Sequence, residues 1–522
     1  MRALRLTLSG VLVGAVCAAA VHGQDSMRQP ASLQQSSFSE YKYNSYYEQD
    51  ASAAPPAAEE QAPAAAAAPA ETGNACNTCS TNCNCNACCD DGCLAEDLLT
   101  LGGRICPDCK PGDPHLLLDH FPCLKKCTKV KMGGWLDQSY TWNPQNPSNG
   151  FNGPVTWTDR SNSYELNQLY YWIERTCDNG GDGWAWGARA DLLFGTDYRF
   201  NTESNLETRY QFQSPKNMGN DRFYGFDYLQ FFGEVAYDKS KFRVGHFLSP
   251  VGYEVIPTTG NFFPTLPYIF QYGEPFTHTG GTWTYTVDET LTVSTGIIRG
   301  WDNFGNNNPH LGNLTTLTKT FEDKSSYATV FIWSSEPNQN NGEFAGGSGN
   351  RAHTPRFIWT HAYTKPLTEK LTYVGQFDYA QQTDAMVNGR LARWYGWNQY
   401  LFYKVSDCWT WGTRFDIWRD EEGFRMGGFL GSTNNGAALR GLSSSFNSFA
   451  GTNYELSVGA NWRPNGNTVI RPAVRWDMFQ GNSGWGAGQQ AFNGGAPTVL
   501  RPYDNGAHDW QILIGFDWIT LF

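Results

Sequence analysis

The sequence predicts an all-β fold: a transmembrane antiparallel β-barrel of about 16 strands over residues 129–522, preceded by a small cysteine-rich module. Three observations support this prediction. Apolar and polar residues alternate along runs that are broken by Gly, Asn, Pro and Asp. Short and long connections alternate between these runs, and the last run ends on the aromatic residue Phe522.

Period-two alternation places charged residues on one face of the predicted strands and aromatic or aliphatic residues on the other. One example surrounds Trp186, and the pattern recurs around Phe415 and Val474. In a transmembrane barrel the aromatic face contacts lipid and the charged face contacts the lumen. These charges either orient polar solutes in a transverse field or neutralise one another in a wet lumen. The candidates to line the pore are Arg189, Asp191, Arg243, Arg414, Asp416, Arg471, Arg475 and Asp477.

The last run is the clearest strand, because its apolar residues all fall on one face. These residues are Trp510, Ile512, Ile514, Phe516, Trp518 and Phe522. A chain that ends on a lipid-facing aromatic residue resembles the insertion signature of outer-membrane barrels. We therefore expect Phe522 to contribute to assembly.

Connection lengths are an independent indication, because outer-membrane barrels have short periplasmic turns and long external loops. Short turns are expected near residues 177–183, 238–240, 287–290, 322–325, 365–369, 406–408 and 463–467. Longer connections are expected at 143–161, 200–221, 249–276, 336–354, 421–452 and 480–508. The resulting even number of strands leaves both ends of the barrel on the periplasmic side.

The N-terminus predicts export. Arg2 and Arg5 precede an apolar run, and small residues before Gln24 suit a signal peptidase, so residues 1–23 are predicted to be a signal peptide. Beyond it there is no run of about 18 apolar residues, which excludes a helical membrane protein. A mean hydropathy of −0.49 is compatible with a barrel, because its strands alternate lipid-facing and lumen-facing residues.

Two further regions precede the barrel. Residues 24–75 are rich in Gln and Ser and then in Ala and Pro, which predicts a disordered linker. Residues 76–128 form a cysteine-rich module that we expect to be held by disulfides, with zinc binding as the alternative. We also consider cell-wall components as its partners. The cysteines are Cys76, Cys79, Cys83, Cys85, Cys88, Cys89, Cys93, Cys106, Cys109, Cys123 and Cys127.

Two more cysteines, Cys177 and Cys408, fall in short turns at the periplasmic end of the predicted barrel. Six strand spacings separate these turns by our count, which exceeds the roughly 7 Å Cα separation that a disulfide tolerates. We expect that they do not bond to each other, and that one or both cross-link to the cysteine-rich module.

No motif indicates an enzyme. The sequence lacks a Gly-x-Ser-x-Gly elbow, a His-Glu-x-x-His helix and a phosphate-binding Gly-Lys-Ser/Thr loop, and its nine His show no metal spacing. We therefore expect no catalytic residues, cofactor or metal. A formal charge of −12 argues against nucleic-acid binding, which needs a concentrated basic surface.

The third long connection, residues 249–276, is predicted to fold into the lumen and narrow the pore. It combines four prolines with unusual apolar mass for an exposed loop. We expect its rings to rest on the wall while its two carboxylates face the passage and favour cations. An external cap or a subunit contact is the alternative. The residues singled out are Tyr253, Glu254, Phe262, Phe263 and Glu274.

Several stretches resemble the putative β-barrel porin-2 (OmpL-like) proteins, which are abundant in planctomycete bacteria. They include RADLLFGTDYRF (189–200), VGYE (251–254), GNFF (260–263), QYGEPFTHTG (271–280), RGWDNF (299–304) and NQYLFY (398–403). The resemblance covers the whole predicted barrel. It implies an outer-membrane protein with passive transport and brings no catalytic residues, and it does not extend to the linker or the cysteine-rich module.

Two functions from different classes are compatible with the sequence. The first is a diffusion porin whose partners are outer-membrane lipid and small polar solutes. The second is a cell-surface glycan-binding or wall-anchoring barrel that does not transport. Aromatic residues, 15% of the chain, suit the interface of a membrane but also suit sugar binding.

Overall fold

A computed structural model gives the fold of this chain. It describes residues 110–117, 130–148, 150–201, 203, 206, 223–305, 310–337, 353–385, 389–426, 449–481, 501–504 and 507–522. The predicted signal peptide and linker lie outside these residues, as does the cysteine-rich module apart from 110–117. Those boundaries stay predictions.

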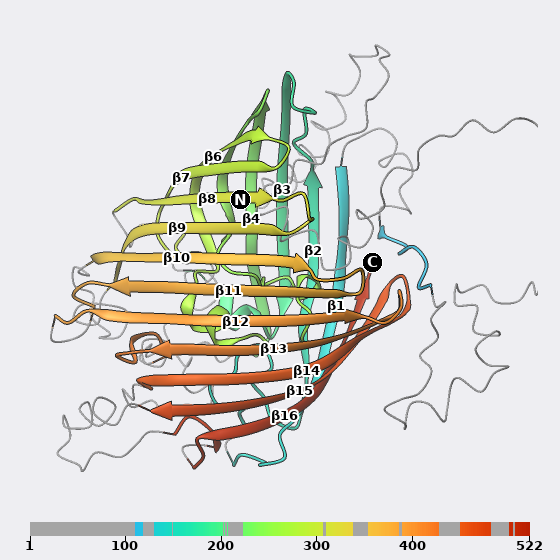
Figure 1. Cartoon of the computed structure of the whole chain (residues 1–522), viewed down its shortest axis with the longest axis vertical. Helices are drawn as coiled ribbons and strands as arrows, with labels where there is room; N and C mark the ends of the chain where they lie inside the picture. The colour runs from blue at the N-terminus through green and yellow to red at the C-terminus, as the bar shows by residue number, and fades with distance from the viewer. Residues whose placement is uncertain are drawn as a thin grey trace, which may run out of the picture.

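In the described residues, sixteen antiparallel strands form one closed barrel in which each strand pairs with its neighbours in sequence and β1 pairs with β16 (Figure 1). The strands are β1 (Val130–Trp142), β2 (Ser163–Arg175), β3 (Trp184–Gly195), β4 (Gly225–Tyr237), β5 (Ser240–Leu248), β6 (Thr277–Asp288), β7 (Leu291–Ile298), β8 (Gly312–Thr320), β9 (Ser326–Pro337), β10 (His353–Pro366), β11 (Leu371–Gln382), β12 (Ala392–Lys404), β13 (Trp409–Asp420), β14 (Gly451–Asn465), β15 (Thr468–Gly481) and β16 (Trp510–Leu521). The predicted fold class is confirmed.

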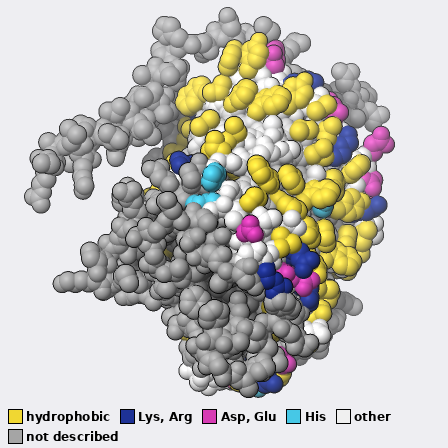
Figure 2. Space-filling view, turned by 90° about the vertical axis from the view of Figure 1, so that its left-hand side faces the viewer, with side chains coloured by type: hydrophobic (Ala, Val, Ile, Leu, Met, Phe, Trp, Pro, Cys, Tyr) yellow, Lys and Arg dark blue, Asp and Glu magenta, His cyan; other side chains and the backbone are white. Residues whose placement is uncertain are grey.

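The two faces of the wall follow the alternation in the sequence. On β3, Trp184 and Trp186 are exposed, whereas Arg189 and Asp191 are buried. Figure 2 shows hydrophobic side chains gathered over much of one side of the barrel. Because polar groups on the outer face would have to lose water to lipid, the outer positions are mainly aromatic and aliphatic.

Helical segments are short and lie between strands. They are α5 (Tyr198–Asn201), the 3₁₀-helix η2 (Thr258–Gly260) and the π-helix η3 (Ile269–Gly273). Among the residues that the structure describes, no helix has the length and apolar composition needed to cross a membrane.

The C-terminal residue extends the seam that closes the barrel. The backbone N–H groups of Gly134 and Phe522 each donate a hydrogen bond of 3.0 Å to the carbonyl oxygen of the other residue. A side chain at position 134 would collide with the Phe522 ring, because a Cβ atom there would lie 2.6 Å from its Cε2 and Cζ. Phe522 therefore extends the ladder between β16 and β1.

The two turn cysteines are not bonded to each other. Of the described cysteines, Cys177 is a free, buried thiol and Cys408 is disulfide-bonded. This confirms the expectation that they do not pair. The partner of Cys408 lies outside the described residues, so a cross-link to the cysteine-rich module stays a prediction.

Deleting Phe522 removes both backbone bonds at the β1–β16 seam and the ring that packs on Gly134. We expect this variant to assemble poorly in the outer membrane. The measurement is the fraction of protein in the outer membrane that runs as a heat-modifiable folded barrel on electrophoresis. Phe522→Tyr, which keeps the ring and the backbone, should assemble normally; full assembly of the deletion variant would contradict this account of the seam.

Candidate functional site

The connection between β5 and β6, residues 249–276, lies inside the barrel. Its apolar residues are buried although they belong to a loop: Phe262, Phe263 and Tyr268 are each at most 3% exposed. Its polar contacts reach inward-facing residues of the wall, as described below. We call this segment the inner loop.

Two arginines of β15 hold the middle of the inner loop. Arg471 donates from Nη1 to the carbonyl oxygens of Thr258 and Asn261 at 2.9 and 2.5 Å, while its guanidinium also binds the carboxylate of Asp517. Arg475 donates to the carbonyl oxygen of Leu266 at 2.6 Å. Backbone carbonyls that lack a strand partner are thereby satisfied, as buried polar groups require.

The same arrangement recurs on β13. Arg414 donates to the carbonyl oxygen of Thr265 at 2.7 Å and forms ion pairs with Glu254 at 3.1 Å and Glu455 at 2.9 Å. Asp416 accepts a 2.7 Å hydrogen bond from the backbone N–H of Tyr268. Burial raises the pKa of Glu254, and the Arg414 guanidinium opposes this shift.

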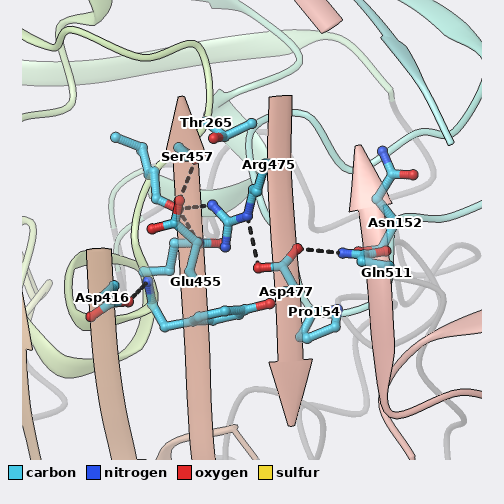
Figure 3. Close-up of polar contacts among 12 residues, drawn as sticks. Asn152, Pro154, Thr265, Asp416, Glu455, Ser457, Arg475, Asp477 and Gln511 are labelled. Atoms are coloured by element: carbon cyan, nitrogen blue, oxygen red, sulfur yellow. Dashed lines mark hydrogen bonds and ion pairs between the residues drawn. The ribbon is translucent and has the colours of Figure 1, made fainter. Parts of the chain in front are cut away.

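Figure 3 shows how these contacts continue across β15 and β16. Arg475 donates to Asp477 at 2.8 Å, and Asp477 accepts a second hydrogen bond from Gln511 at 2.9 Å. Gln511 also donates to the carbonyl oxygen of Asn152, in the loop between β1 and β2, at 3.0 Å. Arg475, Asp477 and Gln511 therefore form a hydrogen-bonded chain, and the pairing of Arg475 with Asp477 lowers the cost of burying these two charges.

Two glutamines of the wall also bind the inner loop. Gln168 on β2 accepts from the N–H of Thr258 and donates to the carbonyl oxygen of Ile256 at 2.8 Å. Gln376 on β11 accepts from the N–H of Tyr253 at 2.7 Å and donates to Glu274 at 2.6 Å. A side-chain amide has both a donor and an acceptor, so it can bind backbone much as a neighbouring strand does.

A buried carboxylate beside Gln168 completes this contact. Asp197, in the loop after β3, accepts hydrogen bonds from Gln168 at 2.9 Å and Asn167 at 3.1 Å. Burial raises the pKa of Asp197 to about 7, while these amide donors oppose the shift. Asp197 thus orients the amide that holds the inner loop.

Aromatic contacts cover the remaining surface of the inner loop. The Phe262 ring lies 4.8 Å from that of Phe402 on β12, and the Tyr253 ring lies 5.0 Å from that of Tyr400. Trp394 on β12 also donates from its indole N–H to the carbonyl oxygen of Gly273 at 2.9 Å. The wall residues that bind the loop therefore lie on one arc, which runs from β11 through β16 to β2.

The opposite arc borders a hollow. Strands β4 to β8 and the start of the inner loop line a hollow that opens to solvent. Hydroxyl side chains dominate its polar lining, and Thr284 donates to Ser294 at 3.0 Å. The lining residues are Glu234, Lys241, Arg243, Phe247, Leu248, Pro250, Thr282, Thr284, Thr292, Ser294, Leu314 and Thr316.

The predicted pore-lining charges fall into two groups. Arg243 borders the hollow and forms an ion pair with Glu234 at 2.7 Å, and Arg189 pairs with Asp191 at 2.7 Å on β3. The five on β13 and β15 are also on the inner face, but the structure buries them beneath the inner loop. These are Arg414, Asp416, Arg471, Arg475 and Asp477.

The expected orientation of the inner-loop carboxylates differs from the structure. Glu254 and Glu274 were expected to face the passage, but they are 2% and 1% exposed. Arg414 and Tyr400 bind Glu254, and Gln376 binds Glu274. Desolvation of a carboxylate is compensated only where donors surround it, so these groups turn toward the polar wall.

Sequence reasoning missed the glutamines that hold the inner loop and the hydroxyls of the hollow. A period-two series of threonines, Thr282, Thr284 and Thr286, was a signal for an inward polar face on β6. Within the described ranges, no three His, Cys, Asp or Glu side chains gather in a way that could hold a metal ion.

Replacing Arg414 by Met removes two ion pairs and a bond to the loop backbone, leaving Glu254 and Glu455 buried without their partner. We expect the free energy of unfolding in lipid vesicles to fall by about 3 kcal/mol and amide exchange in residues 249–276 to accelerate. Arg393→Met, which removes the exposed pair with Glu422, should cost less than about 1 kcal/mol. Equal effects of the two substitutions would contradict the assigned role of Arg414.

Comparisons with known proteins agree with the architecture. The model of the family described as "Putative beta-barrel porin-2, OmpL-like" matches residues 129–522. No curated protein shows a significant match to this chain. The family match extends over the entire barrel.

Solved structures of similar fold are bacterial outer-membrane proteins of low sequence identity. OmpT of Vibrio cholerae is 9% identical with a TM-score of 0.46, covering 75% of this chain and 99% of OmpT. The anion-selective porin from Comamonas acidovorans is 8% identical with a TM-score of 0.46, at 75% and 99% coverage. OprB of Pseudomonas putida is 10% identical with a TM-score of 0.45, at 78% and 99% coverage. On the family match, the chain belongs to the Putative beta-barrel porin-2, OmpL-like family and is a porin of the outer membrane.

Proposed function

We propose that this porin passes small polar solutes by passive diffusion along the wall formed by β4 to β8, and that the inner loop narrows this passage. The observation that carries the proposal is the asymmetry of the lumen. The inner loop is bonded to the arc from β11 to β2, whereas the hollow that opens to solvent lies along β4 to β8.

The lining of the hollow indicates which solutes suit it. Its threonine and serine hydroxyls can both donate and accept hydrogen bonds, so they replace part of the water shell of a polar solute. The carboxylate of Glu234 is paired with Arg243 among the residues that line the hollow. The passage therefore selects mainly by size and hydrogen bonding.

A second role concerns the region before the barrel. We propose that cell-wall components are partners of the cysteine-rich residues 76–128. The contact of His115 with Asn467, in the turn between β14 and β15, supports this proposal because it holds the described part of the module at the periplasmic rim. The periplasm contains the cell wall, whereas the external loops face away from it.

Deleting residues 256–268 removes the section of the inner loop that Arg414, Arg471 and Arg475 hold. We expect single-channel conductance in planar bilayers to rise by roughly twofold or more, because the lumen gains cross-section. Folding of the variant is verified by its heat-modifiable migration. Unchanged conductance of the folded variant would show that the inner loop does not narrow the passage.

A second test narrows the passage by filling the hollow along β4 to β8. Thr284→Trp places a large ring among the hydroxyls of β6 to β8, and we expect it to lower conductance by roughly half or more. Tyr285→Trp is the matched control, since residue 285 is the next residue on β6 and lies on the exposed outer face. Equal conductance of the two variants would contradict the proposed route along β4 to β8.

A further inference from the structure

The turn between β14 and β15 is a docking point for a segment that precedes the barrel. Asn467 accepts a hydrogen bond from the backbone N–H of His115 at 2.9 Å and donates to the carbonyl oxygen of His115 at 2.7 Å. One side-chain amide thus binds both backbone groups of one residue, 352 positions away in the chain. Such a pair of hydrogen bonds resembles the one that two opposite residues of antiparallel strands exchange.

Gly466, the residue before Asn467, allows the backbone of residues 110–117 to approach the turn closely. A Cβ atom at Gly466 would lie 2.6 Å from the carbonyl oxygen of Asp113 and 2.7 Å from that of Gly112. The backbone of the segment therefore occupies the space where a side chain at position 466 would stand. Any larger residue at this turn must displace the segment or move the turn.

Asn467 also joins the turn to the last strand. Its backbone carbonyl oxygen accepts from the N–H of Leu521 at 2.7 Å, and its side-chain amide donates to the carbonyl oxygen of Leu521 at 2.9 Å. The docking point is thus built into the end of β16, next to the residue that closes the barrel.

Cys408 lies on the same part of the rim. It belongs to the turn between β12 and β13, and its carbonyl oxygen accepts a 2.9 Å hydrogen bond from the N–H of Arg463 at the end of β14. Arg463 leads directly into the turn that holds Asn467. Cys408 is disulfide-bonded, and Cys177 is free, so the bond of Cys408 is made with a cysteine outside the described residues.

We propose that the cysteine-rich region is fixed to the periplasmic rim of the barrel at two adjacent points: a backbone clamp of residues 110–117 on Gly466 and Asn467, and a disulfide at Cys408. The clamp is the interaction surface, and its partner is this segment of the same chain. The disulfide makes this attachment covalent. This inference does not depend on solute transport.

The clamp is tested by hydrogen exchange on the full-length, non-reduced protein in detergent. We expect the amide of His115 to be protected, and Gly466→Ala and Asn467→Ala each to accelerate its exchange by roughly tenfold or more. Asn179→Ala is the matched control, because Asn179 makes its hydrogen bonds within the periplasmic rim to Gly183 and Asp238. Gly466→Ala leaves the Asn467 amide in place, so it separates loss of docking from damage to β16.

The disulfide at Cys408 is tested on the same preparation. Free thiols are alkylated under denaturing, non-reducing conditions, and the protein is then reduced and labelled with a heavier reagent. Before reduction, we expect a digest of the alkylated protein to contain a peptide that links Cys408 to a cysteine within 76–127. After reduction, we expect the light label on Cys177 and the heavy label on Cys408. An unprotected His115 amide in the unmodified protein, a light label on Cys408, or a bond between Cys408 and Cys177 would each overturn the two-point attachment.

Discussion

Lipid offers no hydrogen bonds, so every backbone N–H and C=O group in the membrane must find its partner within the wall. The described strands meet this requirement only because β1 and β16 pair with each other and close the ring. The seam extends to the last residue of the chain, where Phe522 and Gly134 exchange two backbone bonds. Closure then assigns one face of each strand to lipid and the other to the lumen, and the remaining features of the molecule follow from that assignment.

The inner face can hold charged residues because they are paired there. Arginine has five N–H donors in a rigid fork, so Arg414, Arg471 and Arg475 can satisfy a carboxylate of the wall and carbonyl oxygens of the inner loop at the same time. These contacts draw the loop toward one arc of the barrel. The asymmetry of the lumen therefore has its origin in the positions of three wall arginines, and the hydroxyl-lined hollow is what remains on the other side.

Local patterns in the sequence predict the wall well. The alternation around Trp186 identifies both faces of β3, and the short turns expected near residues 238–240 and 406–408 separate strands in the structure. These features depend on residues that are close in sequence. The prediction that Cys177 and Cys408 do not bond to each other followed from strand order alone and is confirmed.

The interior could be predicted only in part, because period two tells which face a residue occupies but not what else fills the lumen. Glu254 was expected to border the passage, yet its partner Arg414 lies 160 positions away in the chain and turns it toward the wall. The contacts of Gln168 and Gln376 with the inner loop could not be predicted from the sequence, because a glutamine side chain is compatible with either face of a strand. Thr316 and Ser294 were likewise overlooked, because β-propensity alone explains threonine in a strand.

The central claim is that a water-filled passage crosses this barrel. Single-channel recording of the purified, refolded, unmodified protein in a planar bilayer tests it most directly. The account predicts discrete conductance steps of uniform size that scale with salt concentration. A bilayer that stays silent although the protein is inserted as a folded, heat-modifiable barrel would contradict it.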